Sequence, residues 1–581
     1  MDGLERDEND PEYKKIPPGS VYEFKGIDSR EKINIPEIPR NRQCTNIFCC
    51  FPVLLICLSS LGLAVYVAVS VDVRRFVNGE DECGNICGIE NTKVSKPDCE
   101  PQDYTNMAIT SYSDRSCVHE CKDDRVLIFN RCISKENDIE IDVLVYYIFN
   151  VIFKSGVSAL VMALLAIGKK AYPKYISLHY RISGFILVVL VAFRYATAFT
   201  FWFFVVVMIL LTAAFAGLFW YLSMIIQAII MTVILIIYFA FLFILLWTGR
   251  HKLVIALIRE ASIAIFNIPI LLAFPVTTLI ILLGLDGFTI YLVMAYLSST
   301  EDEISEGLLT AFWLLWAIGM ILIHAFVNGF QWMVIAGSVA GYYFTKDKYQ
   351  VGNTEFVNSF YVTIRYHLGT ISAGSLIITI LSIIRAAAEL ARDNVDDASV
   401  AIVILYYCLL CCVACIEEIA DYLAKKAYII TAMHGKGLLN SGTRAVRLIC
   451  MFLLDLVMVD QFSYLMVNGA AMVILLITLG IGFAMHLNDW SDYFIFLIIL
   501  GVYLISTILY FYFSLLNASI ETTFLCFCED KLMNDGSSAR PYYMTKSLSN
   551  LMVQCTDVAK GRLFKRREKR LERQRRSEDN N

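Results

Sequence analysis

Long apolar segments recur along this chain, and they restrict its fold more than any other feature. These apolar segments are distributed between Ile47 and Phe527. Crossing a bilayer takes ~20 apolar residues in a helix, because ~30 Å of hydrocarbon offers the backbone no hydrogen-bond partner. Of the 581 residues, 57% are hydrophobic and 18% are charged, which is too little charge to cover a soluble protein of this length. The sequence therefore predicts an all-α, polytopic membrane protein.

The apolar runs, together with the Lys/Arg bias of the short loops, predict about ten spans with both ends in the cytosol. One unbroken apolar region, 182–247, lies between two basic loops, so it should hold an even number of spans. We assign two spans to it, meeting near 212–217. The full set is 47–71, 143–168, the two within 182–247, 266–297, 308–344, 368–390, 398–416, 462–486 and 493–524.

These spans divide the chain into five regions. The stretch 447–459 is expected to be an amphipathic helix at the inner interface, with Asp455 and Asp460 in water. The first apolar run lacks a convincing cleavage site and is expected to remain as a signal anchor. The regions are a disordered cytosolic tail (1–46), a first transmembrane helix (47–71), an extracellular Cys-rich loop (72–142), a nine-helix core (143–524) and a basic cytosolic tail (525–581).

Cysteines support this orientation independently. An even set of cysteines in an extracellular segment with few apolar residues predicts a small disulfide-bonded unit, here with three bridges and fifteen possible pairings. A zinc site is the alternative, although the C-x3-C spacing differs from the usual C-x2-C. The six cysteines of the loop are Cys83, Cys87, Cys99, Cys117, Cys121 and Cys132.

Six blocks of the sequence form a recognisable series, at 252–262, 331–344, 364–370, 374–379, 534–536 and 541–544. Together they resemble the choline transporter-like family of solute carriers. The segment 331–344 follows a Q-x-x-x-x-A-G-x-x-x-x-Y-Y-F pattern, and 252–262 resembles the segment after the family's fourth span. The other four blocks follow in family order. The resemblance implies a non-enzymatic carrier that moves choline, or ethanolamine, across the plasma membrane by alternating access. The alternatives are a carrier of another organic cation, such as a thiamine derivative, and a channel.

The residues themselves allow such a function and exclude some others. The sequence contains no P-loop, H-E-x-x-H or G-x-S-x-G motif, so neither ATP-driven pumping nor a common hydrolase is expected, and no cofactor or metal is implied. The expected partners are a small organic cation and the lipid bilayer, and no nucleic acid. The basic segment 560–576 should also attract anionic lipid, because the inner leaflet is negatively charged.

Proteins hold quaternary ammonium ions between aromatic faces, often beside a carboxylate. Trp313 and Trp316 lie one helical turn apart and lead the substrate candidates, with Asp286 as the carboxylate. Tyr342 and Tyr343 come from the block that carries the resemblance. Most Trp and Tyr residues of membrane proteins instead mark the interface.

Ionisable residues within spans cost roughly 2.5–3.5 kcal/mol each, so they point to function. His324 and Glu521 are the candidates for proton coupling. Gly337 and Gly341 form a small-xxx-small pair that favours close helix packing. Asn328 and Gly329 suggest a break in the same long run, as transporters use near their substrates.

Overall fold

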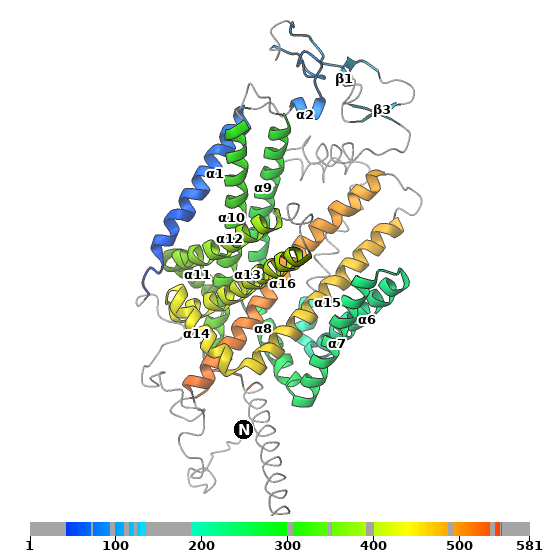
Figure 1. Cartoon of the computed structure of the whole chain (residues 1–581). Helices are drawn as coiled ribbons and strands as arrows, with labels where there is room; N and C mark the ends of the chain where they lie inside the picture. Colours follow the sequence, from blue (N-terminus) through cyan, green and yellow to red (C-terminus); the bar gives the residue numbers. More distant parts are fainter. Residues whose placement is uncertain are drawn as a thin grey trace, which may run out of the picture.

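Helices make up most of the chain in the computed structural model, which describes residues 42–70, 74–92, 99–109, 116–120, 125–128, 131–134, 188–298, 306–346, 348, 351–390, 400–485, 492–534, 541–545 and 548 (Figure 1). The predicted all-α class is confirmed. The helices are η3 (Ile47–Cys49), α1 (Cys50–Ser70), α2 (Arg74–Asn78), α6 (Thr197–Tyr221), α7 (Ile225–Thr248), α8 (His251–Asn267), α9 (Ile270–Ser298), α10 (Glu306–Phe344), α11 (Asn353–Val362), the π-helix η5 (Thr363–His367), α12 (Leu368–Leu390), α13 (Val400–His434), α14 (Leu438–Met451), α15 (Leu453–Met485) and α16 (Asp492–Met533).

Eight helical stretches in the described part of the chain are long and apolar enough to cross a membrane. They coincide with eight of the predicted spans and involve α1, α6, α7, α9, α10, α11 with α12, α15 and α16. The predicted span 398–416 falls on α13, whose 35 residues would also reach across a bilayer at ~1.5 Å per residue. The predicted span 143–168 lies outside the described residues, as do 1–41 and 549–581 of the two tails.

Two predicted boundaries are wrong. The helix break assigned to 212–217 falls instead between α6 and α7, where Ser223 adopts a left-handed φ of 58°. The amphipathic helix assigned to 447–459 is α14, which ends at Met451, and the residues from Leu453 onward begin α15. Asp455 is therefore the acid in the first turn of α15, and it pairs with Arg250 rather than lying in water.

The long helix α10 is continuous through Asn328 and Gly329, so the predicted break there is wrong. Gly329 serves packing instead: a Cβ at this position would lie 3.0 Å from the Tyr428 ring of α13. Gly337 and Gly341 do form a contact surface, because their missing side chains let α11 approach with Ser359 and Glu355. Small residues thus bring α10 against two neighbours, as close helix packing requires.

The first described residues are held against α12 and α13. Arg42 donates to the carbonyl of Ala432 at 2.6 Å and lies 3.0 Å from Nε2 of the buried His367. The Thr45 amide donates to the Tyr366 carbonyl at 3.0 Å. Gly369 makes this crossing possible, since a Cβ there would lie 2.5 Å from the backbone carbonyl carbon of Asn46. The π-helix that carries His367 was not anticipated from the sequence; such turns often mark functional positions.

A small disulfide-bonded unit stands at the opposite end of the bundle (Figure 1). Its bridges join Cys83 to Cys99 and Cys87 to Cys117, which rules out zinc ligation by these four residues. Four short strands, β1 (Ala108–Ile109), β2 (Cys117–Val118), β3 (Arg125–Ile128) and β4 (Arg131–Ser134), form a sheet in the order β2-β1-β4-β3. Cys121 lies outside the described residues, so a third bridge, between Cys121 and Cys132, stays a prediction.

These bridges predict a specific labelling pattern. In intact cells, an impermeant maleimide should label the peptides of Cys83 and Cys117 only after reduction, because oxidised cysteines cannot react and disulfides persist outside the cytosol. The free Cys44 at the other end of the bundle is the internal control and should react only after the membrane is permeabilised. Mass spectrometry of the labelled peptides measures both. Labelling of Cys83 without reduction would contradict the assignment.

Candidate functional site

A buried lysine joins three helices in the interior of the bundle. Lys426 of α13 has a side chain with 0% exposure, and its ammonium lies 2.9 Å from Oε2 of Glu521 on α16. The same ammonium lies 3.2 Å from Oδ1 of Asp460 on α15. A buried charge needs such partners, because removing an ion from water costs several kcal/mol.

An aromatic ring completes this cluster. Tyr422 precedes Lys426 by one helical turn, so both face the same neighbours. The Tyr422 hydroxyl donates to Oδ2 of Asp460 at 2.6 Å, and the centre of its ring lies 4.8 Å from the Lys426 ammonium. Asp460 thus receives hydrogen bonds from the hydroxyl and the ammonium together. The expectation that Asp460 is solvated is wrong, because α13 extends far beyond the predicted span and buries Lys426 against it.

A second lysine lies beside the first. Lys425 pairs with Asp421 at 2.6 Å along α13, and its ammonium lies 5.4 Å from the centre of the Trp332 ring on α10. The group Asp421, Lys425, Lys426, Asp460 and Glu521, here called the central charge cluster, holds three carboxylates against two ammonium groups. With all five ionised it therefore carries one excess negative charge. An apolar interior favours neutralising that charge with a proton or a bound cation.

Access differs among the members of the central charge cluster. The Lys426 side chain has no exposed surface, whereas Asp460 and Glu521 keep 17% and 20% of theirs exposed. Oε2 of Glu521 is itself buried, so the exposed part of that side chain lies elsewhere on it. Asp460 and Glu521, and not Lys426, are therefore the side chains of the cluster that keep some accessible surface.

The sequence-predicted residues Asp286 and His324 meet each other in a second place, between α9 and α10. Nε2 of His324 lies 3.2 Å from Oδ1 of Asp286, and its Nδ1 lies 2.9 Å from the Met320 carbonyl. α9 is unbroken at Asp286, so this acid is a helix residue with a partner. The two side chains are about one third exposed. A carboxylate–imidazole pair of this kind can hold or release a proton.

The two predicted tryptophans lie in the neighbouring apolar cluster formed by α1, α9 and α10. Trp316 is 4% exposed, packs against Phe288 and Phe312, and donates its indole N–H to Thr289 at 3.3 Å. Trp313 packs edge-on against Phe312 at 5.1 Å. Both belong to one cluster, as their spacing suggests, and their contact with a substrate stays a prediction.

Tyr342 and Tyr343 lie at the far end of α10, away from the tryptophans. The Lys348 ammonium sits 5.0 Å and 5.3 Å from their ring centres and donates to the Tyr343 carbonyl at 2.7 Å. Burial lowers the pKa of Lys348. The Tyr343 hydroxyl donates to Asp530 at 3.2 Å. These rings therefore already face a cation supplied by the chain itself.

Two further acids on α16 organise the same end of the bundle, and the sequence did not single them out. Glu529 is fully buried and accepts two hydrogen bonds from Arg444, at 2.6 Å and 2.7 Å, while His434 lies 3.1 Å away. Asp530 accepts from the backbone amides of Tyr543 and Met544, which fastens the segment after α16 to the bundle. The partners of Glu529 lie 85 and 95 residues away, beyond the range of any local pattern.

Residues 229–532, which include the central charge cluster and both predicted groups of site residues, match the model of the plasma-membrane choline transporter family. This match covers more than half of the chain. The chain belongs to this family. The match begins within α7 and ends in α16, so α1 and the disulfide-bonded unit lie outside it.

Curated members of the family are similar to this chain over about half of its length or less. Choline transporter-like protein 2 of Dictyostelium discoideum is 30% identical over 315 residues, which cover 52% of this chain and 50% of that protein. Choline transporter-like protein 1 of Mus musculus is 29% identical over 337 residues, 56% of this chain and 50% of that protein. Choline transporter-like protein 4 of Xenopus laevis is 32% identical over 255 residues, 40% and 35% of the two chains. The chain spans a third to a half of the length of these relatives.

The buried position of Lys426 predicts a large effect on stability. Lys426→Met would leave Asp460 and Glu521 without their shared cation, and breaking a buried ion pair costs about 3–5 kcal/mol. Lys425→Met is the matched control, because Lys425 is partly exposed and its pair with Asp421 lies along one helix, where such pairs contribute about 0.3–0.5 kcal/mol. Thermal unfolding of the purified chain in detergent compares them. Equal midpoints for the two variants would contradict this assignment.

Proposed function

We propose that this chain is a solute carrier that moves choline across the plasma membrane. Membership of the plasma-membrane choline transporter family supports the proposal, as does its similarity to choline transporter-like proteins of other organisms. The observation that carries it is the excess negative charge of the central charge cluster. A monovalent organic cation would neutralise that charge, and Asp460 and Glu521, whose side chains keep some accessible surface, are the acids it would approach.

Choline needs more than a charge partner, because its quaternary nitrogen cannot donate a hydrogen bond. Aromatic faces supply the remaining attraction through the negative charge density of the ring. Tyr422 and Trp332 already lie within 4.8 Å and 5.4 Å of the two ammonium groups of the cluster. We therefore propose that the choline ammonium binds beside Asp460 and Glu521, against the Tyr422 ring.

The group around Asp286 is a second proposed binding site for the substrate. This site and the one beside Asp460 and Glu521 are here called the two stations. Asp286, Trp313 and Trp316 offer one carboxylate and two large rings within the packing of α9 and α10. We propose two proton-coupling groups: His324, which contacts Asp286, and Glu521 of the central charge cluster. Each could exchange a proton as the cation arrives or leaves. Tyr342 and Tyr343 stay weaker candidates, because both are 5% exposed and lie at the far end of α10, away from Trp313 and Trp316.

Transport by alternating access, driven by gradients and not by ATP, fits this arrangement. The disulfide-bonded unit lies at one end of the bundle, and the segments 42–46 and 541–545 close the other (Figure 1). Because disulfides persist in oxidising compartments, the first end is proposed to face outward and both chain termini the cytosol. The central charge cluster would then be exposed to the two sides in turn.

Substitutions in the two proposed stations should separate their roles in uptake. Tyr422→Ala should raise KM for radiolabelled choline roughly fivefold to thirtyfold, because a lost cation–π contact costs about 1–2 kcal/mol. Tyr422→Phe keeps the ring and is the matched control for the hydroxyl bond to Asp460. Glu521→Gln should also raise KM, since it removes the excess charge.

The second station is tested in the same assay at equal surface expression. Asp286→Asn, Trp313→Ala and Trp316→Ala should raise KM severalfold to tenfold if choline meets these groups. Competition by ethanolamine, thiamine and unlabelled choline ranks the substrates, and saturation separates a carrier from a channel. Unchanged KM in all of these variants, Tyr422→Ala included, would overturn both proposed stations.

The C-terminal segment 560–576 lies outside the described residues, and its attraction to anionic lipid is a proposal from charge alone. Ten basic residues against two acidic ones should bind an anionic surface, at about 1 kcal/mol for each basic residue near it. A peptide of residues 558–577 is expected to bind phosphatidylserine liposomes at low salt and to dissociate as salt screens the charges. Equal binding to neutral liposomes is the result that would refute the electrostatic account.

A further inference from the structure

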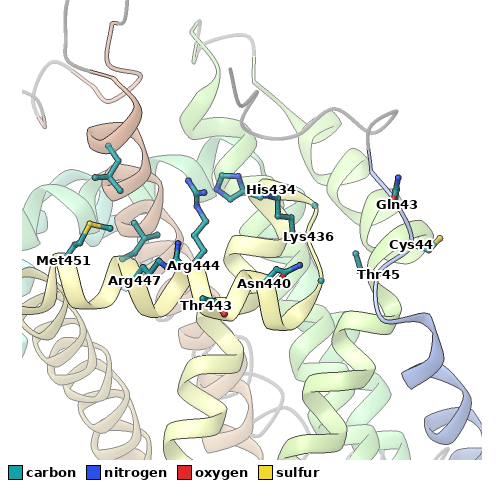
Figure 2. Close-up of a pocket in the computed structure, with 14 residues that line it drawn as sticks. Gln43, Cys44, Thr45, His434, Lys436, Asn440, Thr443, Arg444, Arg447 and Met451 are labelled. Atoms are coloured by element: carbon teal, nitrogen blue, oxygen red, sulfur yellow. The ribbon is translucent and has the colours of Figure 1, made fainter. Parts of the chain in front are cut away.

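A basic pocket lies at the end of the bundle opposite the disulfide-bonded unit. Its volume is about 800 Å³, and it is open to the outside of the molecule. The segment before η3, the turn between α13 and α14, one face of α14 and the end of α16 form its walls. Figure 2 shows the side chains of α14 and of the α13–α14 turn on one side, and Gln43, Cys44 and Thr45 on the other.

The spacing of residues on α14 explains why one wall is rich in donors. Asn440, Arg444 and Arg447 follow each other at intervals of four and three residues, which places them on one face of the helix. Thr443 lies beside them, and Lys436 adds a further ammonium from the turn before the helix (Figure 2). No carboxylate is among the residues that line this pocket.

The positive groups of the pocket divide into two kinds. Arg444 and His434 both contact the carboxylate of the buried Glu529, so its negative charge already compensates part of their positive charge. Lys436 and Arg447 are exposed, and neither forms an ion pair within the described part of the chain. The pocket thus offers two unpaired cations and several neutral donors, and its chemistry suits an anion with several acceptor oxygens. Arginine and lysine together are the usual partners of phosphate.

Exposed apolar side chains lie close in sequence to residues that line the pocket. On α14 Leu439 is 77% exposed, and next to Thr45 the chain exposes Ile47 and Phe48, the latter at 88%. Such side chains suit contact with acyl chains rather than with water. A ligand whose phosphate enters the pocket could therefore keep an apolar part against these side chains.

We propose that this pocket binds the phosphate group of an anionic ligand, held by Lys436, Arg447 and the Asn440–Thr443 donors, and that a lipid headgroup supplies it. On the orientation proposed above, the lipid belongs to the inner leaflet. The site is distinct from the basic segment 560–576 and from both proposed stations for choline. Glu529 holds Arg444 and His434 in place, so these two groups of the pocket are positioned before the ligand arrives.

The test uses the purified full chain in detergent micelles, with phosphatidic acid as the probe and phosphatidylcholine as the neutral-lipid control. Native mass spectrometry measures the fraction of lipid-bound protein across a titration. The double variant K436Q/R447Q should weaken phosphatidic acid binding about twenty-fivefold, since each basic side chain near an anionic headgroup contributes about fivefold. Choline uptake is not the readout, so the result does not depend on the proposed transport activity.

A matched control and a soluble probe decide the interpretation. K252Q/R259Q removes the same two charge types from exposed positions on α8 and should leave binding unchanged. Glycerol 3-phosphate is titrated in parallel: binding of phosphatidic acid alone assigns the site to lipid, and binding of both probes assigns it to the phosphate group itself. Unaltered binding of phosphatidic acid in K436Q/R447Q, or equal losses in both double variants, would overturn the proposal. Unfolding midpoints near that of the unaltered chain show that the variants are folded.

Discussion

Compensation of charge within an apolar bundle is the constraint on which the rest of this structure depends. Lys426 ties α13 to α15 and α16 through Asp460 and Glu521, and Glu529 ties α16 to α14 through Arg444. Each of these acids would be costly to bury alone, so each fixes the position of the helix that brings its partner. α16 takes part in both contacts, which makes it the reference element for the packing of this half of the molecule.

The helices themselves could be predicted from the sequence, because hydrocarbon leaves a chain few options. Apolar length located α1, α9, α10, α12, α15 and α16, and the basic loops on both sides of 182–247 indicated the pair α6 and α7. One error arose where charge was treated as the end of a helix. The predicted span 398–416 ends before Lys425 and Lys426, yet α13 continues to His434 and carries both into the bundle. A helical period was visible there, with Asp421 and Tyr422 each four residues before a lysine.

The candidate site could be predicted only in part, since its contacts join distant segments. The pairing of Asp286 with His324 spans two helices, and nothing local indicates it. Asp460 lay at the edge of an apolar run, where an acid is usually solvated, and only the path of α13 shows its partner. Glu521 was anticipated because an acid inside a span is rare in itself. Composition thus identifies isolated charges, whereas the geometry of the whole bundle identifies pairs.

Gly369 shows how a single atom outside the proposed choline sites can matter. One side of this glycine faces the backbone of Thr45 and Asn46, where the irregular segment before η3 crosses α12. A methyl group at this position would push that segment outward and would disrupt the contact of Arg42 with His367. Genetic variants at this glycine would therefore impair the protein through its scaffold. A survey that ranks substitutions by their closeness to the proposed choline sites would score this position as harmless.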